Sequence, residues 1–139
     1  MKKLYLLLGI LYLVCSCTSS KKLNTNKYSL EIHFGNSGGF TNSQTEYVLN
    51  KNGKLNMIVN NNETEITILE KSTIRKIKKL LKSLDFENLI IDDPGNMTYF
   101  IKVKTTDFEN SAKWNDNTKN QQLKNFYNLL METVRKFKS

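Results

Sequence analysis

Apolar side chains recur at every second position from residue 28 to residue 34, as Tyr28, Leu30, Ile32 and Phe34. Successive side chains of a strand point to opposite faces, so this period of two predicts a strand with one buried face. The glycine-rich segment 35–39 follows, and it is expected to end the strand. A second strand is predicted over about 45–50.

The dipeptide Asn52-Gly53 predicts a tight hairpin turn, because asparagine and glycine both accept the two positive φ values of a type I′ turn. Leu55, Met57 and Val59 then alternate along a third strand. The asparagine run 60–62 marks another turn, and 65–69 can form a further short strand. The first half of the chain is therefore predicted to be an antiparallel meander.

A helical period replaces the period of two after residue 72, where Ser72 can cap a helix over about 73–84. Five apolar residues form one stripe on this helix: Ile74, Ile77, Leu80, Leu81 and Leu84. The opposite face carries five cations: Arg75, Lys76, Lys78, Lys79 and Lys82. This face is interpreted either as a surface for anionic headgroups or an acidic partner, or as the solvated side of a core helix, and the pattern favours the second.

A turn signal at 92–96, which contains Pro94, Gly95 and Asn96, separates that helix from a second hairpin. Tyr99, Ile101 and Val103 define its first strand, and Ala112 with Trp114 define the returning one. A last helix is predicted from six apolar residues at helical spacing: Leu123, Phe126, Tyr127, Leu130, Val134 and Phe137. The sequence predicts a single α+β domain over 28–139, an antiparallel sheet of two hairpin units packed by two amphipathic helices.

The first 16 residues resemble a secretion signal. Lys2 and Lys3 precede an apolar run of eleven residues, 4–14, which as a helix would rise only about 16 Å against a hydrocarbon core of roughly 30 Å. The tetrad 14–17, Val-Cys-Ser-Cys, resembles the bacterial lipobox, and this resemblance implies that cleavage leaves Cys17 as a lipidated N-terminus. Residues 17–27 then form the lipid-bearing cysteine and a polar tether.

The cysteines and the net charge limit which sites and partners the exported domain can have. Cys15 would leave with the signal and Cys17 would carry lipid, so the exported domain is left without a thiol for a disulfide, a zinc site or a nucleophile. Loss of Lys2 and Lys3 takes the basic total from 21 to 19, against 13 acidic residues, a formal charge of +6. In an exported protein this charge favours anionic headgroups or acidic envelope polymers over nucleic acid.

The inventory of catalytic groups is small. His33 is the single histidine, and the alternation assigns it to the polar face of the first strand. No nucleophile-elbow motif and no phosphate-binding glycine loop occurs, and adjacent acids such as Asp92 and Asp93 in a turn usually cap backbone amides. The sequence therefore predicts no enzyme, no cofactor and no metal.

The remaining candidate for function is Gly38-Gly39-Phe40, which follows the strongest strand. Paired glycines permit backbone conformations that other residues avoid, and they can present Phe40 as an aromatic anchor for a partner's pocket. The other interpretation, which the residues favour, is a glycine bulge with Phe40 folded back into the core.

With these residues the chain resembles the emfourin family, small bacterial inhibitors of thermolysin-like metallopeptidases. The similarity covers about 30–135 and rests on order: Gly-Gly-Phe after a first strand, Leu84-Asp85-Phe86 at a helix end, and the strand 99–103 before a hairpin and a last helix. Members usually continue with Ala-Gly, where this chain has Thr41 and Asn42. Small Bacteroidota lipoproteins with a Gly-Gly-Phe-Thr segment and a Trp-x-Asp phrase, here 114–116, look closer still.

The resemblance implies a non-enzymatic binding module in the cell envelope, anchored by lipid at Cys17, with Gly38, Gly39 and Phe40 contacting a metallopeptidase or another envelope protein. Surface-displayed lipoproteins of Bacteroidota often carry acidic residues just after the lipidated cysteine, and this chain has no acidic cluster there. The comparison implies a location on the outer membrane, facing the periplasm. The alternative is a structural or assembly lipoprotein that uses Arg75, Lys76, Lys79 and Lys82 against anionic lipid or an acidic partner.

Overall fold

The computed structural model describes residues 29–40, 43–59 and 61–137. The predicted signal peptide and the lipid-bearing tether lie outside these ranges. In the described part, the strand that begins at Leu30 is the central strand of one sheet, which is mainly antiparallel. The chain forms a single α+β domain, which confirms the predicted fold class.

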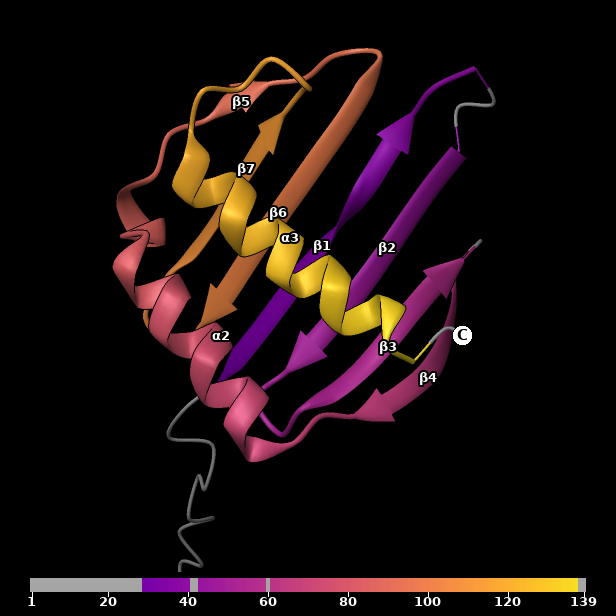
Figure 1. The fold of residues 1–139 in the computed structure, drawn as a ribbon, viewed down its shortest axis with the longest axis vertical. Coiled ribbons are helices and arrows are strands. Elements are labelled where there is room, and N and C mark those ends of the chain that lie inside the picture. Colours follow the sequence, from indigo (N-terminus) through magenta and orange to yellow (C-terminus); the bar gives the residue numbers. More distant parts are fainter. Residues whose placement is uncertain (1–28, 41–42, 60, 138–139) are drawn as a thin grey trace, which may run out of the picture.

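Seven strands and two α-helices make up the described fold (Figure 1). The strands run in the spatial order β4-β3-β2-β1-β6-β7-β5, and every neighbouring pair is antiparallel except β5 with β7. The strand bounds are β1 Leu30–Gly38, β2 Ser43–Asn50, β3 Lys54–Val59, β4 Asn62–Ile68, β5 Asp92–Asp93, β6 Met97–Thr105 and β7 Glu109–Trp114. The helices are α2 Lys71–Ser83 and α3 Gln121–Arg135, with a 3-10 turn η2 at Phe86–Asn88.

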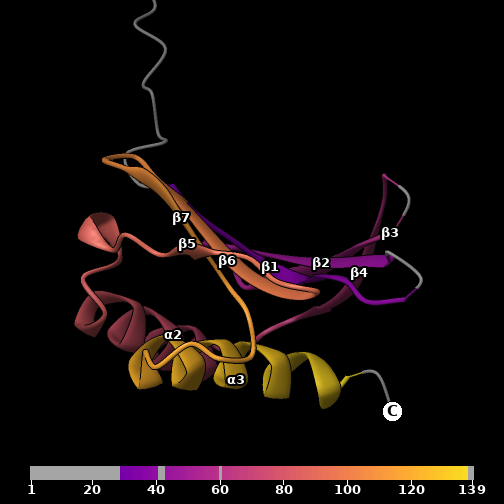
Figure 2. The same ribbon diagram turned by 90° about the horizontal axis from the view of Figure 1, so that it is seen from above.

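Both helices lie against the same face of the sheet, and no described helix covers the other face (Figure 2). Alternate strand residues therefore divide into an inner, buried set and an outer, more exposed set. The inner side chains and the helix stripes form one core: Leu30, Ile32, Phe34, Tyr47, Leu49, Leu55, Leu69, Ile77, Leu81, Leu84, Phe86, Ile101, Val103, Ala112, Trp114, Leu123, Phe126, Tyr127, Leu130 and Val134. Because this core lies between Leu30 and Val134, a chain that begins at Thr18 retains all of it.

The first strand is longer than its glycine content predicts. Gly35 was expected to begin a break, yet β1 continues to Gly38 with β2 on one side and β6 on the other. Backbone hydrogen bonds on both edges outweigh the weak strand propensity of glycine. The close approach also requires glycine, since a Cβ on Gly35 would lie 1.9 Å from the Thr45 carbonyl oxygen.

The turn at Asn52-Gly53 is not the predicted type I′ turn. Gly53 has a φ of +88°, but Asn52 has no positive φ. The turn is instead shaped by the Asn50 Oδ1 atom, which accepts from the backbone N–H groups of Asn52 and Lys54. These side-chain bonds replace the predicted type I′ geometry.

The helix ends also differ from prediction. Helix α2 begins at Lys71, and Ser72 does not cap it, because the Ser72 hydroxyl donates to the Glu70 carboxylate at 3.2 Å. Helix α3 ends at Arg135, so Phe137 falls beyond it and is half exposed instead of joining the apolar stripe. Within the described residues, no helix is long and apolar enough to cross a membrane.

The docking of α3 on the sheet predicts a clear difference between two neighbouring substitutions. Leu123 is 0% exposed in the core, whereas Gln122 is exposed to solvent. Leu123→Ala should lower the free energy of unfolding by about 2–5 kcal/mol because it leaves a cavity under the helix. Gln122→Ala should change it by less than about 0.5 kcal/mol. Urea unfolding of residues 18–139 measures both, and equal effects would contradict the docking of α3.

Candidate functional site

The end of β1 carries the segment that the sequence singles out. Gly38 is paired with Ser43 on β2 and with Met97 on β6, so both neighbouring strands fix its backbone. Gly38 and Gly39 have φ values of +103° and +75°, in the region that favours glycine. The chain turns here, at the end of β1 opposite Leu30 (Figure 1).

Close backbone contacts hold this turn. The Gly39 N–H donates to the Asn96 carbonyl oxygen at 2.8 Å. A Cβ on Gly38 would lie 2.1 Å from the same oxygen, and a Cβ on Gly39 would lie 3.1 Å from the Met97 sulfur. Gly38 is therefore required both by its φ and by lack of space, whereas Gly39 is required chiefly by its φ.

Phe40 is fully exposed at the tip of this turn. The interpretation in which Phe40 folds back into the core is therefore excluded. Exposed phenylalanine keeps a large apolar surface in water, and its burial by a partner is worth roughly 1.5–3 kcal/mol. Gly38, Gly39 and Phe40 together are called here the Phe40 tip.

The Trp114-Asn115-Asp116 phrase supports the loop beside the tip. Trp114 is buried against Tyr99 and Tyr127, with ring centroids 6.2 and 5.4 Å away. The Asn115 amide donates to the Asp93 carbonyl oxygen at 3.1 Å, and the Tyr99 hydroxyl donates to Asp116 at 2.7 Å. The bond to Asp116 raises the pKa of Tyr99. These residues position the loop that contains Asn96, on which Gly39 depends.

His33 is the other group that sequence reasoning weighed. Its Nε2 atom lies 2.5 Å from Glu31 and its Nδ1 atom lies 2.7 Å from Glu46. Both ring nitrogens are thus engaged by carboxylates on the uncovered face of the sheet. No group of three metal-ligating side chains converges within residues 29–40, 43–59 and 61–137. The contact with Glu46 links β1 to β2, whereas the contact with Glu31 lies within β1.

Neither family models nor curated proteins match this chain. The resemblance to emfourins therefore stays a prediction.

The cations of α2 do not all lie as the helical pattern indicates. Arg75, Lys76, Lys79 and Lys82 are exposed, whereas Lys78 is half buried. Among the described residues, no carboxylate lies within ion-pair distance of those four exposed cations. Within the described ranges, their face therefore carries positive charge without direct ion pairs.

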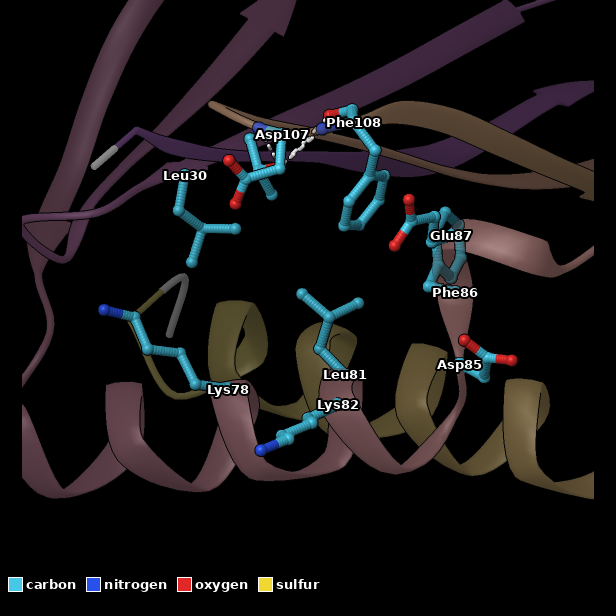
Figure 3. A pocket seen from close by; sticks show the side chains of 10 residues that line it. Leu30, Lys78, Leu81, Lys82, Asp85, Phe86, Glu87, Asp107 and Phe108 are labelled. Atoms are coloured by element: carbon cyan, nitrogen blue, oxygen red, sulfur yellow. Dashed lines mark hydrogen bonds between the residues drawn. The ribbon is translucent and has the colours of Figure 1, made fainter. Parts of the chain in front are cut away.

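A pocket beside α2 has an apolar lining with charged side chains of both signs around it (Figure 3). Leu30, Leu81, Phe86 and Phe108 provide its apolar lining, with Lys78 and Lys82 on the helix side and Asp85 and Glu87 near the 3-10 turn. Sequence reasoning missed the part that Leu30 and Phe108 take in this pocket, because they come from strand ends distant in sequence.

The contact between Gly38 and Asn96 predicts that a substitution at Gly38 destabilises the protein more than one at Gly39. Gly38→Ala should lower the free energy of unfolding by about 2 kcal/mol or more, because its Cβ has no space and its φ is unfavourable. Gly39→Asn should cost less than about 1 kcal/mol, since asparagine accepts this φ more readily. Thermal and urea unfolding test this order. A larger cost at Gly39 than at Gly38 would contradict the geometry of the tip.

Proposed function

We propose that this protein is a lipid-anchored cell-envelope binding module, without enzymatic activity, that inhibits a thermolysin-like metallopeptidase through the Phe40 tip. The observation that carries the proposal is the full exposure of Phe40 on a backbone fixed by two strands and by the bond from Gly39 to Asn96. Because the backbone that leads to Phe40 is already held, its conformational entropy need not be lost on binding. The emfourin-like order of motifs supplies the class of partner.

The geometry of β1 also supports the proposal. Leu30 and Gly38 are the two ends of one nine-residue strand, about 27 Å apart at the usual rise per residue. Lipid at Cys17 would hold the Leu30 end toward the bilayer of the outer membrane. The Phe40 tip would then face the periplasm, where an apolar protease pocket could receive it.

The contacts of His33 support the proposal that the protein is not an enzyme. Each of its ring nitrogens contacts a glutamate, so the single histidine has no position free for a substrate. Inhibition needs only that Phe40 occupies the apolar pocket of the cleft and that the glycines allow close backbone approach. No cofactor and no metal of its own is required.

A second candidate function is a structural or assembly lipoprotein. It treats α2 as an amphipathic helix whose polar face, with Arg75, Lys76, Lys79 and Lys82, contacts anionic lipid or an acidic partner. The observation that favours it is the absence, among the described residues, of carboxylates in ion-pair distance of these cations. Such charges attract an anionic surface by about 1 kcal/mol each.

The proposal predicts that Phe40→Ala weakens inhibition of a thermolysin-like enzyme by about 30-fold or more, because the anchor side chain is lost. Stability should not change, since Phe40 makes no core contact. Ile90→Ala is the matched control, because Ile90 is also an exposed apolar residue, at 94%. The measurement is the inhibition constant of residues 18–139, compared with those of the two variants. Unchanged inhibition by Phe40→Ala would remove the proposed mechanism.

The anchor predicts a separate result in cells. Cys17→Ser removes the only thiol that the lipobox resemblance assigns to lipid, so labelling of the protein with a radioactive fatty acid should disappear. The protein should also leave the detergent phase in a phase-separation assay. Cys15→Ser is the control, and it should keep the label. Labelling that persists in Cys17→Ser would reject the lipid attachment.

A further inference from the structure

Four cations line a single cleft where the β2–β3 turn meets α2. The cleft is formed by Lys51, Asn52, Lys71, Ile74, Arg75 and Lys78, and it is called here the basic cleft. None of its lining residues is acidic. It differs from the exposed face of α2, because it includes Lys51 and Lys71 and leaves out Lys76, Lys79 and Lys82.

A glycine contact brings the two parts of the cleft together. Gly53 lies so close to α2 that a Cβ on it would be 2.6 Å from the Ile74 Cδ1 atom. The Leu69 N–H donates to the Gly53 carbonyl oxygen at 2.8 Å, which fixes the turn beside the start of the helix. Lys71, Arg75 and Lys78 are spaced by four and three residues, so they share one side of α2. Lys51 is thereby held opposite them.

The electrostatics of the cleft favour an anion. Among the described residues, Lys71 and Arg75 have no carboxylate within ion-pair distance, and a bound anion would lower the repulsion between these like charges. Helix α2 begins at Lys71, has no acidic residue in its first turn and has no side-chain cap, so its N-terminal partial positive charge adds to the lysines. Glu70, the nearest acid in sequence, is exposed and accepts a bond from Ser72. Arginine and lysine together suit phosphate oxygens.

The position of the cleft points to the source of that phosphate. An adjoining cleft shares Lys51 and Asn52 and is completed by Ser29, Leu30, Glu31, Asn50, Lys104 and Thr106. Ser29 is held there by its N–H, which donates to Thr106 Oγ1 at 2.8 Å. From Ser29 to Cys17 the chain has 12 residues, a reach of at most about 43 Å. The segment that leads to the proposed anchor thus leaves from the basic end of the domain.

We infer that the basic cleft binds the phosphate of anionic lipid headgroups in the same membrane that holds Cys17. This inference rests on the proposed lipid anchor and gives the second candidate function a defined site. Headgroup binding would hold the start of β1 toward the bilayer and turn the Phe40 tip away from it. The orientation would follow from two points of attachment, the lipid and the cleft.

The experiment measures binding of residues 18–139 to phosphatidylcholine vesicles with and without phosphatidylglycerol by flotation. A cleft variant, Lys51→Glu with Lys71→Glu, is compared with Lys79→Glu with Lys82→Glu, which makes the same change of charge near the other end of α2. The cleft variant should lose about 20-fold or more in partition coefficient. The control should lose less than about threefold, because Lys79 and Lys82 lie roughly 12–16 Å along the helix axis from Lys71, more than the Debye length of about 8 Å at physiological salt. Circular dichroism verifies that both variants are folded.

Equal losses in the two variants would overturn the cleft while leaving the helix face of the second candidate in place. No binding to phosphatidylglycerol vesicles by the unaltered domain would reject both. A third arm titrates inorganic phosphate alone and follows the amide resonances of Lys51 and Arg75. Saturation of those shifts at micromolar phosphate would show that the cleft binds soluble phosphate, and it would overturn the inference that the ligand is a lipid headgroup. None of these outcomes affects inhibition by the Phe40 tip.

Discussion

Pairing of β1 along both of its edges is the constraint on which the rest of the structure depends. The strand is matched residue by residue with β2 and with β6 from near its start to Gly38. Its inner side chains Ile32 and Phe34 are at most 1% exposed and lie under the helices. The same strand determines where the two candidate surfaces lie, because its first residue adjoins the basic end and its last residue leads into the Phe40 tip. A rigid central strand therefore separates the two surfaces.

Glycine performs two different tasks at the ends of this framework. At Gly35 and Gly38 the neighbouring carbonyl oxygens leave no space for a Cβ, so glycine permits tight strand packing. At Gly53 the absence of a side chain lets the β2–β3 turn lie against Ile74 of α2. In each case a backbone contact brings together residues that are distant in sequence. The tip and the basic cleft both result from such contacts.

Much of the fold follows from hydrophobic periodicity. The inner faces of β1, β6 and β7 lie where the patterns predict, because burial of one face is a strong local signal. Val59 of β3 is instead 42% exposed, and Phe137 lies beyond the end of α3. The extension of β1 through glycine was not predicted, because tertiary pairing overrides local propensity. The predicted Ser72 cap of α2 was wrong, because the Ser72 hydroxyl bonds to Glu70 instead. Phe40 was identified as a candidate, but its exposure depends on Asn96, 56 positions away. Lys51 was not identified, because only the docking of Gly53 on α2 brings it to Lys71 and Arg75.

The central claim is that the Phe40 tip contacts a metallopeptidase in the envelope. Photo-cross-linking in cells tests it most directly, with a benzophenone amino acid placed at position 40 or at the exposed position 90. The account predicts that mass spectrometry finds a thermolysin-like peptidase, with its His-Glu-x-x-His zinc motif, bound to position 40 and not to position 90. No peptidase adduct at position 40, or the same adduct at both positions, would contradict the claim.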